Sequence, residues 1–242
     1  MKTAFKLFQI LILLFVGCKR ETCFGEAGAV VAVTRAAAGF QEIDVRDNIN
    51  VVLTQDTVEG ITIEAPEHLV PNISTEVTNG ILNLKNKAAC TGLRKASEKV
   101  TVYVRLKKLD KILYAGSGSV RSTNTLVADN MTFYSETGAG NIDVSLAAVQ
   151  TFCYIMDENA DITLQGASTV CYSYTAARGT INFSNFVVKK MIIEYGSVRD
   201  AVINVTDDLN AIIYFKGNLF YKGTPQITKN EVHSSGRLIH RF

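Results

Sequence analysis

The segment MTFYSETGAGNI, residues 131–142, decides the fold because the chain repeats its pattern on both sides. Each repeat is a run of alternating apolar residues followed by a short turn rich in small or polar residues. The repeats are KILYAGSGSV (111–120), MTFYSETGAGNI (131–142), TFCYIMDENADI (151–162), TVCYSYTAARGTI (169–181), MIIEYGSVRDAVI (191–203) and AIIYFKGNL (211–219). Such repetition indicates one structural unit stacked several times.

The spacing of the repeats identifies the unit. Branched residues close the turns at intervals of about 20 residues, at Val120, Ile142, Ile162 and Ile181. The repeats alternate with a period of two and contain no helical apolar stripe, so each consists of strands. A strand-rich repeat of this length is typical of a parallel β-solenoid. The sequence therefore predicts an all-β fold, a parallel β-helix or solenoid with about 20 residues per rung.

Aligning the strand starts predicts which side chains face outward, since alternate residues of a strand point to opposite sides. The predicted inward column is Leu113, Phe133, Cys153, Cys171, Ile193 and Ile213. The next residues form a predicted outer column of Tyr114, Tyr134, Tyr154, Tyr172, Glu194 and Tyr214. The same outer face is predicted to carry Ile112, Thr132, Phe152, Val170, Ile192 and Ile212. This apolar and aromatic strip is the predicted ligand or partner surface, unless N-terminal strands or a terminal loop cover it.

The same alignment makes Cys153 and Cys171 neighbours on adjacent rungs. Their separation suits a disulfide. Two side chains that point the same way from parallel strands would strain that bond, so we favour two buried free thiols that act as small apolar groups.

The glycine-rich turn YAGSGSVRS, residues 114–122, has two interpretations. A phosphate-binding loop requires a helix directly behind it, because the helix N-terminus supplies the N–H groups. Here the strand-like SVRSTNTLV (119–127) follows instead. Small residues that adopt positive φ at a solenoid corner are therefore favoured, and no nucleotide cofactor is expected.

The N-terminus has the pattern of an export signal. Two lysines precede the apolar run LFQILILLFVG (7–17), which is too short to span a bilayer. The run ends in FVGC (15–18), which resembles a lipoprotein signal sequence with Cys18 as the lipidated residue; ordinary secretion is the alternative. We therefore expect a signal peptide at residues 1–17, the lipidated cysteine and a tether at 18–38, and one domain at 39–242.

The domain begins with strands that need not belong to the repeat. From Phe40 onward, short runs with a period of two are separated by turn residues, and Asn79-Gly80 predicts a hairpin.

Composition and residue spacing limit the kinds of ligand that we expect. The 242 residues carry a net charge of +2, which favours neither general polyanion binding nor a nucleic-acid partner. The three histidines are scattered and no Cys-x-x-Cys occurs, so no metal site is expected.

Several motifs together resemble the head GIN domain family of auto-transporter adhesins, common among lipoproteins of Bacteroidota. They are FQEIDVRDNINVVLTQ (40–55), GITIEAPEHLVPNISTEVTNGILNLKNK (60–87), GSGSV (116–120), TGAGNI (137–142) and YKGTPQIT (221–228). DENAD (157–161) and AARGT (176–180) depart from the Gly-x-Gly form. The resemblance implies a right-handed β-helix outside the cytoplasm and no known reaction.

We therefore expect an exported outer-membrane lipoprotein, on the periplasmic or cell-surface face, that binds a protein or glycan without catalysis. The alternatives are a glycan-cleaving β-helix enzyme and a structural protein that forms homo-oligomers. An enzyme would need convergent charged groups, for which the candidates are Asp143, Asp161, Arg121, Arg178 and Arg199.

Overall fold

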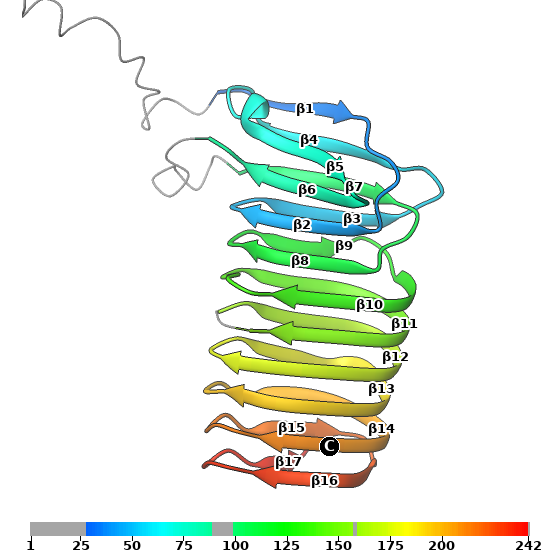
Figure 1. Ribbon diagram of the computed structural model, residues 1–242, viewed down its shortest axis with the longest axis vertical. Coiled ribbons are helices and arrows are strands. Elements are labelled where there is room, and N and C mark those ends of the chain that lie inside the picture. Colours follow the sequence, from blue (N-terminus) through cyan, green and yellow to red (C-terminus); the bar gives the residue numbers. More distant parts are fainter. Residues whose placement is uncertain (1–27, 89–98, 157–158, 242) are drawn as a thin grey trace, which may run out of the picture.

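The computed structural model describes residues 28–88, 99–156 and 159–241. Within them the chain forms seventeen strands and one short 3-10 helix, so the all-β prediction is confirmed (Figure 1). None of the described residues belongs to a helix long and apolar enough to cross a membrane.

The repeats form a parallel β-solenoid, as predicted. Its strands are β8 (Lys111–Gly116), β9 (Ser119–Ser122), β10 (Leu126–Ser135), β11 (Asn141–Ile155), β12 (Asp161–Ala177), β13 (Thr180–Ser197), β14 (Ala201–Ile213), β15 (Leu219–Lys222), β16 (Gln226–Val232) and β17 (Leu238–His240). Front strands run leftward and back strands rightward as the chain descends, so the coil is right-handed (Figure 1).

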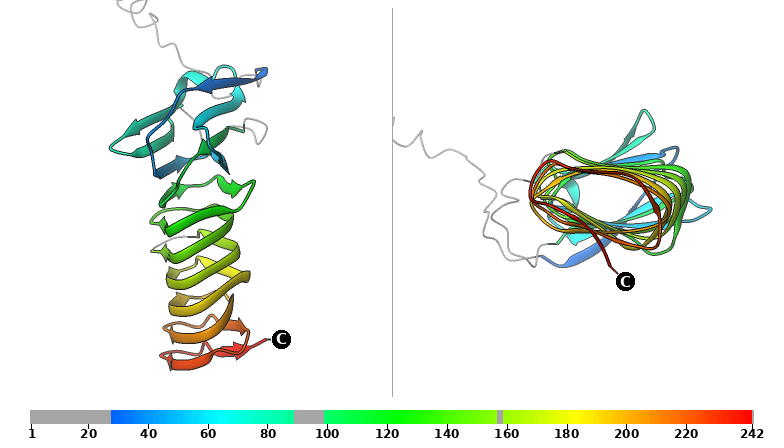
Figure 2. Two further views of the ribbon diagram at one scale, coloured as in Figure 1. Left: turned by 90° about the vertical axis from the view of Figure 1, so that its right-hand side faces the viewer. Right: turned by 90° about the horizontal axis from the view of Figure 1, so that it is seen from below.

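The predicted register of the turns is confirmed. Ile142 pairs with Val120 of the rung before it and with Ile162 of the rung after it, and Ile162 pairs with Ile181. All four side chains are buried. Seen from below, successive rungs superimpose as a flattened coil (Figure 2). Two sheets therefore face each other across a narrow apolar core.

The long strands β10 to β14 bend around one edge of the coil, so that all but β10 pair within both sheets. The first sheet, which we call the front sheet, contains β6, β2, β8, the C-terminal halves of β10 to β14, and β16. The back sheet contains β7, β3, β9, the N-terminal halves of β11 to β14, β15 and β17.

The N-terminal part precedes the coil in the chain but does not stack in chain order. Its elements are β1 (Val30–Arg35), β2 (Glu42–Asp47), β3 (Asn50–Gln55), β4 (Gly60–Pro66), the 3-10 helix η1 (Val70–Asn72), β5 (Ile73–Thr78), β6 (Ile81–Asn86) and β7 (Thr101–Leu106). Strands β2 and β3 form a rung between β6–β7 on one side and β8–β9 on the other. The later strands β6 and β7 therefore lie on one side of the β2–β3 rung, and the regular coil begins with β8 and β9 on its other side.

Antiparallel strands complete this end of the molecule. Strand β5 pairs with β6 through the predicted hairpin, in which Asn79 and Gly80 both have positive φ (52° and 77°). Strand β4 pairs with β7, and β1 pairs with β4. The hairpin prediction is confirmed.

The glycines of the coil corners are required by close backbone contact. A Cβ on Gly118 would lie 2.0 Å from the carbonyl oxygen of Ile49, and a Cβ on Gly140 would lie 2.0 Å from that of Gly118. Neither glycine has positive φ. The predicted reason for glycine, positive φ, was therefore wrong, because the rungs stack so closely at this corner that no side chain fits.

We expect Gly118→Ala to lower the free energy of unfolding by about 1–3 kcal/mol, the usual cost of inserting a methyl group into a packed site. Gly60→Ala is the matched control, because its Cβ would meet only the end of the Arg105 side chain, at 3.4 Å. Chemical denaturation of both variants tests this. Equal stability of the two variants would contradict the close-contact explanation.

Candidate functional site

Two neighbouring columns of the front sheet carry a cluster of aromatic side chains. Parallel pairing aligns Tyr134 with Tyr154 and Tyr154 with Tyr174. It also aligns Phe152 with Tyr172. We call the resulting surface the aromatic strip and define it as Tyr134, Phe152, Tyr154, Tyr172, Tyr174 and Ile192.

The rings of the aromatic strip contact one another. The Phe152 and Tyr172 rings, on successive rungs, are nearly parallel, with centroids 5.2 Å apart. Phe152 also lies 6.4 Å from Tyr154 on its own strand, at an angle of 17°. Tyr134 tilts by 57° against Tyr154. These contacts join the four rings into one continuous cluster.

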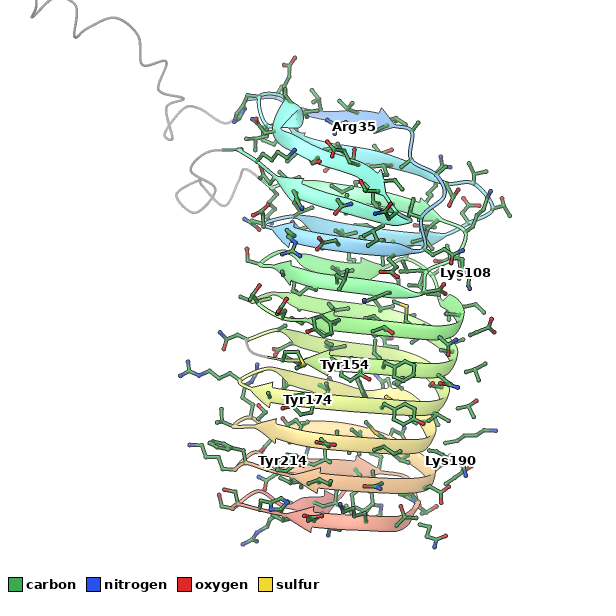
Figure 3. All side chains as sticks on the ribbon, in the orientation of Figure 1. Arg35, Lys108, Tyr154, Tyr174, Lys190 and Tyr214 are labelled. Carbon is green, nitrogen blue, oxygen red and sulfur yellow. The ribbon has the colours of Figure 1, made fainter. Side chains whose placement is uncertain are left out.

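Nothing in the described residues covers the aromatic strip. Tyr174 and Ile192 are 36% and 42% exposed, and the other four members are half-buried. Strands β2 and β6 continue the front sheet above β8 and do not fold over it. Tyr154 and Tyr174 accordingly lie on the open front of the coil (Figure 3). The interpretation in which N-terminal strands cover the strip is wrong.

Tyr114 is not part of this surface, although the sequence placed it there. Ser135, not Tyr134, pairs with Tyr114, so the first rung is one residue out of step with the predicted alignment. A shift of one residue turns a side chain to the other face. Tyr114 is 2% exposed, and Leu113 takes the outer position beside Tyr134.

Tyr114 instead supports the corner from inside. Its hydroxyl donates to the carbonyl oxygen of Gly118, and its ring fills the space beside Gly138. Burial raises the pKa of Tyr114 to about 12. Tyr195 has a similar role lower in the coil, where its hydroxyl donates to the Arg199 carbonyl oxygen at 2.5 Å. Its pKa is also raised by burial.

The predicted position of Tyr172 was wrong by two residues. The similar segments TFCY (151–154) and TVCY (169–172) suggest an alignment of like with like, but Thr151 pairs with Cys171. Tyr172 is therefore beside Phe152, and Tyr174 takes the position beside Tyr154. The sequence signal that could have located Tyr174 was a constant rung of 20 residues from Tyr134 through Tyr154.

The other predicted outer residues are distributed differently. Ile112 is buried, opposite Phe133, and Val170 lies one column away, opposite Gln150. Ile212 takes the place below Glu194.

Tyr214 follows the last residue of β14, at the lower end of the front sheet. Its hydroxyl donates to a Glu194 carboxylate oxygen at 3.2 Å, and its ring is stacked on that of His233, with centroids 5.1 Å apart. Desolvation and the charge of Glu194 raise its pKa. Tyr214 therefore contacts Glu194, the residue paired with Tyr174, and is not itself a member of the aromatic strip. Figure 3 shows Tyr214 below Tyr174.

Cys153 and Cys171 are both buried free thiols, as we favoured. The prediction that they lie directly opposite each other on adjacent rungs was wrong, because Cys153 lies opposite Ser173 and Cys171 lies opposite Thr151. Burial, with the neighbouring Cys171, raises the pKa of the Cys153 thiol. Both thiols therefore serve as small core side chains.

Three of the five charged residues considered for glycan cleavage, Asp143, Asp161 and Arg199, interact with other side chains. Asp161 forms a two-point ion pair with Arg199, at 2.6 and 3.0 Å. Asp143 lies opposite Arg121 on the next strand and accepts a hydrogen bond from Gln165 at 3.4 Å. Across the described ranges, no three His, Cys, Asp or Glu side chains gather closely enough to hold a metal ion.

The family profile described as "Putative auto-transporter adhesin, head GIN domain" matches residues 39–225. Among solved structures, the chain is similar to a "putative adhesin" from Bacteroides fragilis, with 22% identity, a TM-score of 0.77, and 88% of this chain and 97% of that chain covered. It is also similar to a "putative adhesin" from Parabacteroides distasonis, with 20% identity, a TM-score of 0.70, and 88% and 98% covered.

A third solved structure, a "Putative lipid binding protein" from Parabacteroides distasonis, has 18% identity, a TM-score of 0.66, and 90% and 98% covered. At these identities the structures establish the shared fold alone. No curated protein is significantly similar to the chain.

We expect Tyr114→Phe to destabilise the protein by about 1–3 kcal/mol, because the buried Gly118 carbonyl loses its donor. The pKa of Tyr114 is raised in the folded state, so its contribution is present below pH 10 and is lost between about pH 10 and 12. The wild-type protein should therefore lose stability more steeply than the variant in this range. Urea titrations at pH 8, 10 and about 11.5 measure the difference. Tyr134→Phe, on the outer face, is the control and should match the wild type.

Proposed function

The chain belongs to the head GIN domain family, and from this premise we propose that it is a non-catalytic, adhesin-like binding protein of the cell envelope. We propose further that it contacts a protein partner through the aromatic strip. The single observation that carries this proposal is the aromatic and aliphatic surface on the front sheet, which none of the described residues covers.

The composition of the aromatic strip supports binding. Soluble proteins rarely leave contiguous apolar surface open unless it has a partner. Tyrosine is enriched where partners bind most strongly, since it combines apolar area with a polar tip at small entropic cost. Ring contacts already restrict Phe152, Tyr154 and Tyr172, so less side-chain freedom is lost on binding.

A protein partner fits this surface better than a glycan. Sugar rings carry hydroxyl groups around their edges, and burying these without hydrogen bonds is costly. The tyrosine hydroxyls are the hydrogen-bonding side-chain groups of the strip, since Phe152 and Ile192 have none. Glu194, which pairs with Tyr174 on the next rung, already accepts a hydrogen bond from Tyr214. A flat apolar surface of a protein would require fewer polar contacts.

The location proposed for the protein follows from its N-terminus. Cys18 and the signal segment lie outside the described residues, so their roles stay sequence predictions. We propose that a lipid on Cys18 anchors the chain in the outer membrane, with the solenoid on the periplasmic or cell-surface side. Strand β1 begins at Val30 and pairs with β4, so a tether of about 12 residues would then separate the folded part from the membrane.

Lipidation is tested by Cys18→Ser in the native organism. The wild-type chain should incorporate labelled palmitate and sediment with the outer membrane, because the acyl chains are its anchor. The variant should incorporate no label and leave the membrane fraction. Cys23→Ser is the matched control and should behave as the wild type. Labelling of the Cys18→Ser chain would disprove the assignment.

Partner binding is tested by placing a photo-crosslinking phenylalanine analogue at Tyr154 in living cells. We expect a covalent adduct whose protease digest contains peptides of a second protein by mass spectrometry, because the strip is in contact with a protein. The same analogue at Tyr103, a 37% exposed tyrosine of β7 outside the strip, is the control. Tyr174→Ala combined with Ile192→Ala should reduce the adduct at Tyr154 about tenfold or more, since truncating a hot-spot residue costs about 2 kcal/mol or more and a tenfold change in affinity corresponds to about 1.4 kcal/mol.

The identity of the adduct decides between the functions. An adduct whose added mass is removed by glycosidases, and which yields peptides of this chain alone, would replace the protein partner by a glycan. An adduct formed only with a second copy of this chain would support the structural homo-oligomer instead. Equal adducts at Tyr154 and Tyr103 would contradict any special role of the aromatic strip.

A further inference from the structure

The lowest rung of the coil has an open edge. Strand β16 forms its ladder with β14 alone, and β17 forms its ladder with β15 alone. In the described part of the chain no strand pairs with the other edge of either one. At the opposite end β5 and β1 are short antiparallel additions, so the two ends differ (Figure 1).

This edge exposes both backbone and apolar side chains. Six of the seven residues of β16 are exposed. Ile227 lies below Leu209 and Val232 lies below Ile213, in core columns, yet each is 42% exposed. An exposed strand edge is a template for pairing with another strand. The last rung therefore offers hydrogen-bonding groups and the end of the core together.

The backbone groups of β16 alternate between β14 and the open edge. The His233 N–H donates to the Ile213 carbonyl oxygen, towards β14. Since backbone direction alternates along a strand, Asn230 and Val232 point their N–H and C=O groups to the open edge. Lys229 precedes Asn230 and Glu231 follows it. Their side chains lie on the outer face, because Lys229 pairs with Asn210 and Glu231 pairs with Ile212.

We propose that two copies of this chain join end to end, with β16 of one copy antiparallel to β16 of the other about a two-fold axis through Asn230. Asn230 then exchanges backbone hydrogen bonds with its own copy. Lys229 lies directly opposite Glu231 of the other copy, and Glu231 lies opposite Lys229. The ion pair already present within the chain, 2.7 Å between Lys229 and Glu231, becomes part of a four-charge network.

The order of charges along β16 favours a second copy of the chain as the partner. A two-fold axis places each residue of the strand opposite the residue equally far from the centre. Opposite charges on either side of Asn230 therefore attract in this arrangement, whereas like charges would repel. Closure about the axis also leaves no further β16 edge free, so the pairing stops at two copies.

The dimer has a consequence that rests on the proposed function. The axis is perpendicular to the front sheet, so rotation about it keeps the front face in front. Both aromatic strips then lie on the same side of the dimer. Two linked sites can engage a repeated or clustered partner with greater avidity than either alone.

The experiment is analytical ultracentrifugation of the purified protein from about 1 to 100 µM. We expect the average mass to rise from one chain towards two. Lys229→Glu should weaken the dimer about tenfold or more, because it sets two pairs of like charges opposite each other. The swapped variant Lys229→Glu with Glu231→Lys should restore association. Lys107→Glu, with the same charge change on an exposed residue away from this edge, should have no effect.

Asn230→Pro provides a second test, because it removes an N–H that points to the open edge and does not pair with β14. Circular dichroism checks that each variant keeps its strands. A wild-type protein that stays monomeric over the whole range would overturn the proposal. So would a dimer that survives both Lys229→Glu and Asn230→Pro.

Failure of this proposal and failure of the proposed function are distinguishable. The variant Tyr154→Ala with Tyr174→Ala should remain dimeric, because the aromatic strip lies away from β16. If this variant is monomeric while Lys229→Glu still dimerises, the strip is the interface between copies, and the pairing through β16 is wrong.

Discussion

Parallel hydrogen bonding between successive rungs is the constraint on which the rest of this structure depends. Each rung must pair with the one above in a single register, because a slip of one residue exchanges its inner and outer faces. The corners enforce that register where Gly140 lies against Gly118 and Gly118 lies against Ile49, with no room for a side chain. Tyr114 fills the inside of the same corner and donates to it.

Register in turn produces the surface that we propose for binding. When rungs of 20 residues follow one another, Tyr134, Tyr154 and Tyr174 lie in one outer column, beside Phe152 and Tyr172. A single aromatic residue on a strand would be an ordinary exposed side chain. Repetition at the spacing between strands turns several of them into one continuous surface of contacting rings.

The two ends of the coil solve the problem of strand edges differently. At the N-terminal end the chain inserts β2 and β3 beneath β6 and β7 and adds antiparallel strands. At the C-terminal end no strand of the described residues pairs with the outer edge of β16, where Lys229 and Glu231 lie on either side of Asn230. Charges on an edge strand oppose indiscriminate pairing. In this order they also select one partner, a copy of the same strand in the opposite direction.

The sequence by itself determined the repeat length, the all-β class and the corner glycines, because each leaves a local signal. The turns end in branched residues such as Ile142 and Ile162, and Asn79-Gly80 marks its hairpin without reference to other strands. It also indicated an aromatic outer face that includes Tyr134, Tyr154 and Phe152. Only the tertiary structure decided which other residues belong to this outer face. Tyr114 is inside and Tyr174 is outside because corner lengths, not local similarity between segments, set how one rung pairs with the next.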